Sequence, residues 1–273
     1  MNAKLISKCS NSKDLNRTLP QCATQKMPPF PSLKNPPIIE AQLNFQLDAS
    51  AGWSRFGSPT GVAELFPSHP EVQALQQFVF QTNPPQAGLA PVHGFFLRNP
   101  AHPTVYQIRR DGFAFSRLSP YLGWDSLVEP ALKGWTQYQQ MMQTGELNGI
   151  SLTYINRLEV PRAEFVADRD RYLTIAPRVP TLSSATPWHF AAFAHRSVYL
   201  PQGSRFQIAV NLARDAGDLN PDVAAIILEI SVSPLPGVEI GTDDLACFLE
   251  QMRDLKNQAF FSITTEESRL RYI

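Results

Sequence analysis

Arginine side chains on three expected strands are the main chemical candidates in this sequence. Arg98, Arg109 and Arg157 stand in segments with strand-like alternation. A guanidinium can bind a carboxylate or a phosphate through two parallel hydrogen bonds. If Arg109 and Arg157 share one face of a sheet, they form a positive stripe for an anion or an acidic partner. The alternative is that they are solvated sheet arginines paired with Glu159 or Glu40, since exposed ion pairs are common and weak.

Two asparagines are expected to be partly or fully buried. Asn156 alternates with Tyr154 and Leu158, so its amide should point inward, where it needs hydrogen-bond partners. Asn257 falls in the expected last helix at a half-buried position. Either residue could contact a ligand, but a structural polar network is favoured because buried amides usually serve the fold.

Patterns for metal binding and acid–base catalysis are weak. His189 and His195 stand six residues apart in one expected strand, about 20 Å at ~3.3 Å per residue, so they cannot share a metal ion. Asp168 and Asp170 could hold a divalent cation. Arginines alternate with these carboxylates, which favours a self-paired charge cluster at the surface. We therefore expect no catalytic residue, no metal and no cofactor.

The three cysteines, Cys9, Cys22 and Cys247, lie far apart and form neither a disulfide framework nor a zinc pattern. This usage predicts a cytoplasmic protein. Cys247 falls near the start of the last expected helix, where the helix terminus would lower its pKa. It has no histidine nearby in the sequence, so half-buried packing is favoured over a nucleophilic role.

Composition excludes some classes of function. The chain has 273 residues, 43% of them hydrophobic, and a formal net charge of +0. This balance argues against a protein that coats nucleic acid or an acidic membrane. No apolar run approaches the ~18 residues that a membrane helix needs. Composition leaves the oligomeric state open.

The first 36 residues differ from the rest of the chain. They are basic and rich in Ser, Asn, Gln and Pro, which predicts a disordered tail over 1–36. This tail is the only segment expected to reach nucleic acid, and a solvated leader is favoured. We expect a single α+β domain over 37–273, with a weak internal repeat between 37–148 and 149–273.

A hairpin centred on Asp111-Gly112 organises the expected fold. This dipeptide is typical of a two-residue type I′ turn, which requires a left-handed backbone. The turn would place Ile108 opposite Phe115 on an apolar face. The opposite face should meet solvent or a partner. It carries Gln107, Arg109, Ala114 and Ser116.

A helix and a strand follow this hairpin. An apolar stripe at three- and four-residue spacing predicts a helix from near Leu127 to Thr144-Gly145. Pro130 fits only the first turn of such a helix. Alternation then predicts a strand over 150–158, ended by Pro161.

The segments before the hairpin predict a strand and a helix. Alternation predicts a strand over 39–47 with Ile39 on its apolar side. Residues 48–67 are expected to be irregular. Ser68 and Pro70 are typical of a helix start, so we expect a helix from there to Pro84. A short strand is expected over 94–98.

The last hundred residues predict further strands and a long helix. We expect a short strand over 172–175 and a long loop over the rest of 162–187. A hairpin is expected between 188–200 and 205–213, with its turn at Gly203, and a strand over 223–232. Thr242 should cap the last helix. Thr264 with Glu267 resembles a capping box for a final turn.

This order of elements predicts an α+β fold. Hairpins imply an antiparallel sheet, and the two amphipathic stripes need an apolar face to cover. We expect one curved antiparallel sheet packed on two long helices.

Four phrases carry a resemblance to a known family: PPIIEA at 36–41, FAFSRLSPYLGW at 113–124, LTYINRL at 152–158 and LKNQAFFSIT at 255–264. Together and in this order, they resemble a sporadically distributed bacterial family of uncharacterised proteins of about this length. The resemblance covers roughly residues 36–265. It implies a bacterial cytosolic protein and brings no activity, cofactor or catalytic residue.

Three functions are compatible with the sequence. The favoured hypothesis is a binding or adaptor protein that acts through contacts with another protein. The second is a small-ligand binder, with a pocket between sheet and helices lined by Trp135, Tyr154 and Phe260. The third is an enzyme without a recognisable motif. A deep pocket with convergent polar groups would favour the second hypothesis, and an exposed apolar patch would favour the first.

Overall fold

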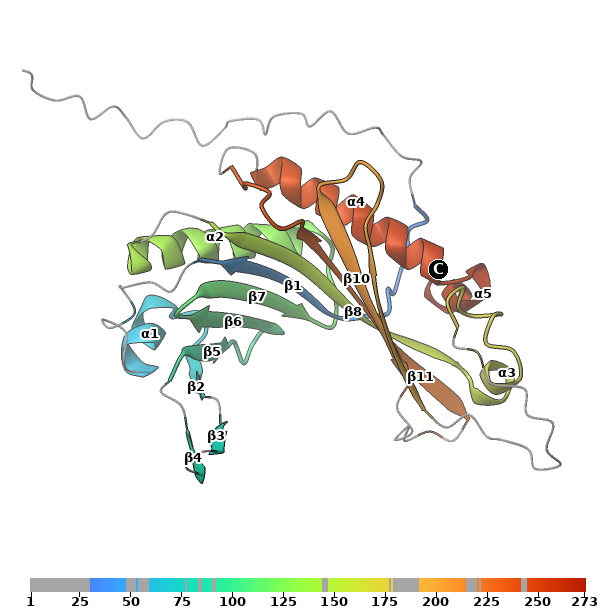
Figure 1. Ribbon diagram of the computed structural model, residues 1–273, viewed down its shortest axis with the longest axis horizontal. Coiled ribbons are helices and arrows are strands. Elements are labelled where there is room, and N and C mark those ends of the chain that lie inside the picture. The colour runs from blue at the N-terminus through green and yellow to red at the C-terminus, as the bar shows by residue number, and fades with distance from the viewer. Residues whose placement is uncertain are drawn as a thin grey trace, which may run out of the picture.

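The fold is α+β, built on an antiparallel sheet of nine strands (Figure 1). The computed structural model describes residues 30–47, 53, 59–76, 78–82, 85–89, 92–143, 147–176, 178, 192–214, 220, 222–241 and 245–273. In the part of the chain that these ranges cover, no helix combines the length and apolarity needed to cross a membrane.

The sheet has the strand order β2-β5-β6-β7-β1-β8-β11-β10-β9. Its strands are β1 (Ile38–Gln46), β2 (Glu71–Leu75), β5 (Gly94–Arg98), β6 (Thr104–Arg109), β7 (Gly112–Leu118), β8 (Gly149–Pro161), β9 (Phe193–Tyr199), β10 (Phe206–Arg214) and β11 (Val223–Pro234). A separate hairpin is formed by β3 (Phe78–Thr82) and β4 (Pro85–Leu89). Strands β1 and β8 pair at the centre of the sheet.

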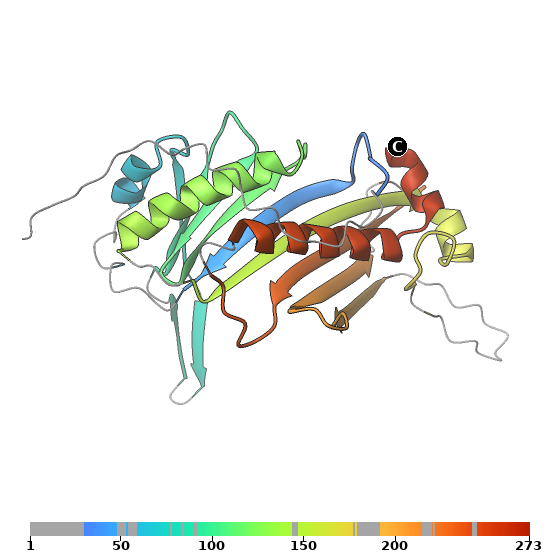
Figure 2. The same ribbon diagram turned by 90° about the horizontal axis from the view of Figure 1, so that it is seen from above.

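Two helices lie over different parts of this sheet (Figure 2). The helix α2 (Asp125–Met142) contacts β7 and β1, and α4 (Leu245–Ile263) contacts β8, β10 and β11. The shorter helices are α1 (Pro59–Leu65), α3 (Arg162–Ala167), α5 (Glu266–Arg269) and the 3-10 helix η3 (Leu270–Tyr272).

One continuous apolar core joins α2 and α4 to the same face of the sheet. Phe45 of β1 stacks on Trp135 of α2, with ring centroids 4.9 Å apart. On the other side, Phe206 of β10 meets Phe248 of α4 at 5.1 Å. The strand pairing puts Phe45 and Phe206 on one face, because side chains on paired strands keep the same alternation.

The hairpin of β6 and β7 has the predicted faces but a different register. Ile108 pairs with Phe113 and not with Phe115, so the turn lies at 110–111. Gly112 already belongs to β7. A Cβ on Gly112 would lie 2.2 Å from the backbone oxygen of Phe45. The glycine therefore serves the close approach of β7 to β1, which the turn pattern could not reveal.

The expectation that the second face of this hairpin meets solvent is only partly correct. Gln107 and Arg109 are half-buried, but Ala114 and Ser116 are buried. Longer side chains cover them, since Gln42 of β1 donates to the hydroxyl of Ser116 at 2.8 Å. Burial here comes from neighbouring strands.

A register shift changes the start of β1. The strand is irregular between Ile38 and Glu40. Ile38 is buried, whereas Ile39 is 38% exposed. The prediction for Ile39 was wrong because an irregularity of this kind exchanges the two faces of a strand.

The predicted helix from Ser68 to Pro84 is wrong. This segment forms β2 and β3, and the helix α1 precedes it in the stretch expected to be irregular. The apolar residues there fit a helical spacing. Pairing with β5 gives the backbone of β2 its hydrogen bonds in the sheet, and this tertiary pairing outweighs the local pattern.

The helix and the strand after the hairpin form close to where they are expected, but Pro130 lies inside the helix and not in its first turn. α2 begins at Asp125 and contains Pro130, and Gln143 ends it in a left-handed conformation with φ 53°. The predicted stop at Thr144-Gly145 lies outside the described residues. The alternation in β8 is as predicted, and the strand ends at Pro161.

The last third of the chain requires three corrections. The expected loop after Pro161 begins with α3. The expected strand over 172–175 is a single bridge between Leu173 and Thr264. The final turn is capped by Thr265, whose hydroxyl accepts from the amide of Ser268. The hairpin of β9 and β10 is confirmed, and Thr242 lies outside the described residues.

Candidate functional site

The sheet separates Arg109 from Arg157, so they form no joint stripe. Arg109 lies opposite Gly112, Gly112 opposite Gln46, and Gln46 opposite Gly149. Arg157 stands eight residues beyond Gly149 on β8 (157 minus 149). At ~3.3 Å per residue this is about 26 Å along the strand. The hypothesis of a shared positive stripe is therefore wrong.

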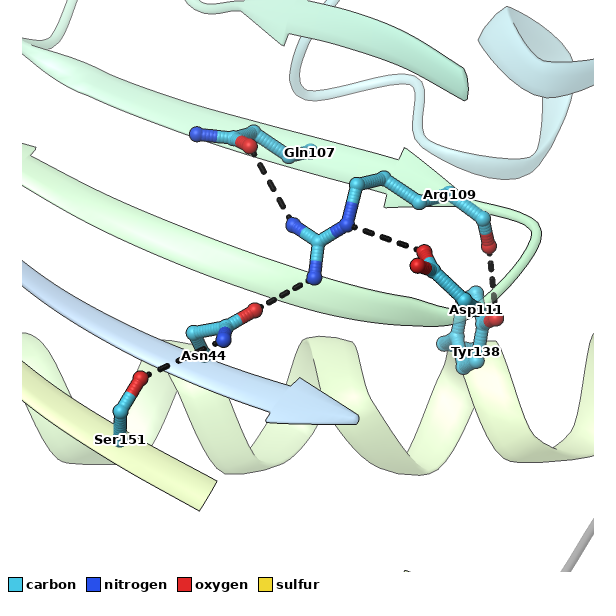
Figure 3. A network of polar contacts seen from close by, with 6 residues as sticks. All are labelled: Asn44, Gln107, Arg109, Asp111, Tyr138 and Ser151. Carbon is cyan, nitrogen blue, oxygen red and sulfur yellow. Dashed lines mark hydrogen bonds and ion pairs between the residues drawn. The ribbon is translucent and has the colours of Figure 1, made fainter. Parts of the chain in front are cut away.

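The guanidinium of Arg109 bonds to residues of β6 and β1 on the face of the sheet turned away from α2 (Figure 3). Its Nη2 donates to Asn44 Oδ1 on β1 at 2.5 Å, across the intervening strand β7. Its Nη1 donates to Gln107 at 3.3 Å and its Nε to Asp111 at 3.3 Å. Asn44 in turn donates to Ser151 of β8 at 3.3 Å.

α2 contacts Arg109 from the other side of the sheet. The hydroxyl of Tyr138 donates to the backbone oxygen of Arg109 at 2.7 Å, and the Arg109 side chain is 17% exposed. Each of its three guanidinium nitrogens already has a protein acceptor. Arg109 therefore acts as a structural clamp between strands.

The other two arginines are surface groups. Arg157 donates to Glu159 at 3.0 Å, as the paired alternative predicts, and both side chains are about half exposed. Arg98 lies exposed at the end of β5, opposite Val105. Such exposed positions allow weak ion pairs only.

The structure brings the two predicted asparagines to one pocket. This pocket, of about 180 Å³, lies where the segment 31–38 passes over α4 and β8. We name it the Lys256 pocket. It is lined by Pro31, Leu33, Pro36, Pro37, Ile38, Tyr121, Asn156, Lys256, Asn257, Phe260 and Phe261.

The predicted lining of a pocket between sheet and helices, by Trp135, Tyr154 and Phe260, is partly correct. Phe260 lines the Lys256 pocket, and the Tyr154 ring contacts Lys256. Trp135 lies elsewhere, in the core against Phe45. The position of α2 over β1 explains this, because its apolar face is filled by aromatic side chains.

Lys256 is the chemically distinctive group of the pocket. Its Nζ lies 4.0 Å from the centroid of the Tyr154 ring. Burial, and then the charge of Arg253, lower the pKa of Lys256 to about 7. None of the ion pairs among the described residues includes Lys256. An amine in this state is partly neutral at physiological pH and can act as a nucleophile or a hydrogen-bond donor.

Two tyrosine hydroxyls form a short contact beside the lysine. The hydroxyl oxygens of Tyr121 and Tyr154 are 2.7 Å apart, and the rings meet edge to face. Burial raises the pKa of both phenols, most strongly that of Tyr154. Both hydroxyls are therefore neutral near pH 7 and can donate as well as accept hydrogen bonds.

Asn156 is held by β11. Its side chain is 2% exposed, and its Nδ2 donates to the backbone oxygen of Leu228 at 3.0 Å. Its inward direction is thus as predicted. Asn257 is half-buried on α4. Asn156 has a structural bond and also lines the pocket. A structural role and contact with a ligand are therefore compatible for this residue.

Residues 30–36 include part of the lining of the Lys256 pocket and fall within the segment 1–36 that is predicted to be a disordered tail. Phe30 stacks on Phe261 at 4.9 Å, and the backbone amide of Asn35 donates to the backbone oxygen of Tyr272 at 3.3 Å. These residues pack on α4 and end at β1. The tail prediction thus extends too far at its end, and residues 1–29 lie outside the described residues.

Lys256 was not among the residues predicted from the sequence. Lysines on amphipathic helices are usually solvated, so a lysine beside the apolar Leu255 gave no signal. The functional environment comes from Tyr154 and Asn156, about one hundred residues earlier in the chain. Their alternation on β8 was visible, but their proximity to α4 was not.

A second polar cluster surrounds His69. Its Nδ1 lies 2.9 Å from the hydroxyl of Ser68, and its Nε2 lies 2.9 Å from that of Thr104. Burial, and then the charge of His102, lower the pKa of His69 to about 4. The imidazole is therefore neutral and links the segment before β2 to β6. Ser68 borders a wider pocket of about 580 Å³.

The remaining candidates are placed as follows. Asp170 accepts from Arg178 at 2.6 Å and Arg171 pairs with Glu164 and Glu267, so these two members of the cluster pair with residues outside it. His195 is exposed on β9, and His189 lies outside the described residues. Within the described ranges, no group of three or more His, Cys, Asp or Glu could hold a metal ion.

Cys247 is disulfide-bonded, with its partner outside the described residues. This excludes a thiolate nucleophile in that state. It also removes the cysteine argument for a reducing compartment.

Comparisons with known proteins give no relative: no family model matches the chain, and no curated protein is similar to it. The resemblance of the four phrases therefore stays a prediction.

Proposed function

We propose that the protein binds a small ligand rich in hydrogen-bond acceptors in the Lys256 pocket. The observation that supports this is a lysine amine that lines a pocket without an ion pair among the described residues. Charged groups are rarely desolvated without a partner unless they serve a site. A ligand would provide that partner.

The lining defines the class of ligand. Lys256, Asn257 and Tyr121 supply donors, and Ile38 and Phe260 supply apolar walls. A few polar groups on an apolar lining are typical of small-molecule sites. The volume of about 180 Å³ is below the ~300–1,000 Å³ typical of ligand pockets, so the ligand must be small. A small carboxylate or carbonyl compound fits both the donors and the size.

Saturation-transfer NMR with a set of two- to six-carbon carboxylates and carbonyl compounds tests this proposal. We expect signals from some members with the wild-type protein and none with Lys256→Met, which keeps the apolar stem and removes the amine. Lys34→Met is the matched control, because Lys34 is exposed on the segment that forms the pocket wall. Equal signals from the wild type and Lys256→Met would refute the proposal.

The edge strand β9 supports a second function, contact with another protein. β9 is the last strand of the sheet, so one of its edges is unpaired within it. At its end, Val198, Tyr199 and Leu200 are 51%, 42% and 67% exposed. Exposed apolar residues on a free edge favour the addition of a partner strand. We infer a partner that contributes an extended segment to β9.

Affinity purification with the wild-type protein and Leu200→Glu tests this second function. A stoichiometric companion that is retained by the wild type and lost with Leu200→Glu would support it. Leu122→Glu is the control, since Leu122 is 64% exposed but lies before α2, away from β9. Recovery of the wild-type protein as a lone monomer would count against an adaptor role.

We also propose that the two halves arose by duplication. Apart from β2, β3 and β4, which have no counterpart in the second half, the order β1, α1, β5, β6, β7, α2 is matched by β8, α3, β9, β10, β11, α4. In each half the strand that precedes the long helix pairs with the first strand, as β7 with β1 and β11 with β8. A chain of residues 37–148 that dimerises as a folded protein would support the proposal, and an unfolded one would argue against it.

A further inference from the structure

We propose that Lys256 forms an imine with a small aldehyde or ketone bound in the Lys256 pocket. The inference rests on the proposed function and names the reactive group of the ligand. It also gives the pocket a covalent chemistry, which the third hypothesis, an enzyme without a recognisable motif, left unspecified.

The position of the amine supports a nucleophilic role. Lys256 lines the pocket and is half-buried, so a ligand in the pocket would lie against this side chain. Its pKa of about 7 leaves about half of the amine neutral at that pH. An ordinary lysine, with a pKa of 10.5, would be neutral to a fraction on the order of 10⁻³ or less.

The groups around Lys256 explain why the neutral amine persists. The Tyr154 ring attracts the ammonium form, whereas burial and Arg253 oppose it more strongly. The carboxylate of Glu250 is engaged elsewhere, since it accepts from Trp124 Nε1 at 2.6 Å and pairs with Arg253 at 3.2 Å. The phenols of Tyr154 and Tyr121 stay neutral near pH 7.

The reaction balances without a further reagent. The Nζ lone pair attacks the carbonyl carbon, the C=O π bond breaks, and the oxygen takes a proton to give a carbinolamine. Nitrogen loses a proton, the C–O bond breaks, and a C=N bond forms with release of water. Tyr121 lines the same pocket, and its hydroxyl is the group that we propose protonates the departing oxygen. Hydrolysis reverses the sequence.

Reductive methylation of the whole protein tests the nucleophile directly. Formaldehyde with cyanoborohydride converts each imine to a stable methylamine, and peptide mass spectrometry gives the rate at each lysine. At pH 7 we expect Lys256 to react at least tenfold faster than the exposed Lys34, with half-maximal reactivity near pH 7. A rate equal to or below that of Lys34 would overturn the inference.

Pyruvate and lactate separate the two proposals, because only pyruvate has a ketone. An adduct at Lys256 after treatment with pyruvate and cyanoborohydride supports the imine. Binding of both compounds by NMR without an adduct overturns the imine and leaves the proposed function standing. Absence of binding and of any adduct, formaldehyde included, overturns both. The labelling uses the wild-type chain, so it does not depend on the folding of a variant.

Discussion

Lys256 Nζ lies 4.0 Å from the centroid of the Tyr154 ring, although one residue belongs to α4 and the other to β8. The aromatic face replaces the carboxylate that a desolvated lysine usually pairs with. This contact joins α4 to the central pair of strands and places an amine beside a pocket. The proposed binding and the imine chemistry both depend on it.

The depressed pKa of Lys256 predicts a specific pH dependence of stability. Between pH values of about 7 and 10.5 the unfolded chain binds more protons at this residue than the folded chain. The free energy of unfolding should therefore rise with pH across this window, by up to about 1.4 kcal/mol per pH unit. The free-energy cost of burying the ammonium form is absent above a pH of about 10.5 and complete below a pH of about 7.

Urea denaturation of the wild type and Lys256→Met at several pH values measures this term. The difference in unfolding free energy between them should change in favour of the wild type as pH rises. Tyrosine titration occurs in both proteins and cancels in the comparison. A difference that stays constant from pH 7 to 10 would contradict the buried amine.

The clamp formed by Arg109 predicts a stability role. Arg109→Met removes the hydrogen bonds to Asn44, Gln107 and Asp111. We expect a loss of about 1.5–3 kcal/mol in unfolding free energy, the range for hydrogen bonds that involve a charged group. Arg157→Met, which breaks the exposed pair with Glu159, should cost less than about 1 kcal/mol. Equal costs would show that Arg109 is no clamp.

Asn156 predicts a similar contrast inside the core. Asn156→Leu removes the donor to Leu228, so a buried backbone oxygen loses its bond. We expect destabilisation of about 1–3 kcal/mol in thermal or urea unfolding. Asn257→Leu, on the half-buried helix position, should cost distinctly less. A stabilising effect of Asn156→Leu would mean that the amide serves the pocket alone.

Gly134 predicts a case in which packing outweighs helix propensity. A Cβ at this position of α2 would lie 2.4 Å from Phe113 Cζ. Gly134→Ala should therefore destabilise the protein by about 1–3 kcal/mol through overpacking, despite the gain of about 1 kcal/mol in propensity. Circular dichroism melting gives the comparison. An increase in melting temperature would show that Phe113 can move aside.

The sequence predicted the class of fold because local patterns decide it. Alternation in β8 and the three- and four-residue spacing in α2 each bury one face, and only an antiparallel sheet covered by helices satisfies both. The same local rules failed from Ser68 to Pro84, where apolar spacing fits a helix. There the hydrogen bonds of β5 decided in favour of a strand.

Only part of the candidate site could be predicted from the sequence. Alternation alone determined that Asn156 points inward, because side-chain direction in a strand is a local property. Only the tertiary structure placed Lys256 over Tyr154 and Arg109 within reach of Asn44. Desolvation of an amine depends on atoms from distant parts of the chain, and no local spacing encodes which helix covers which strand.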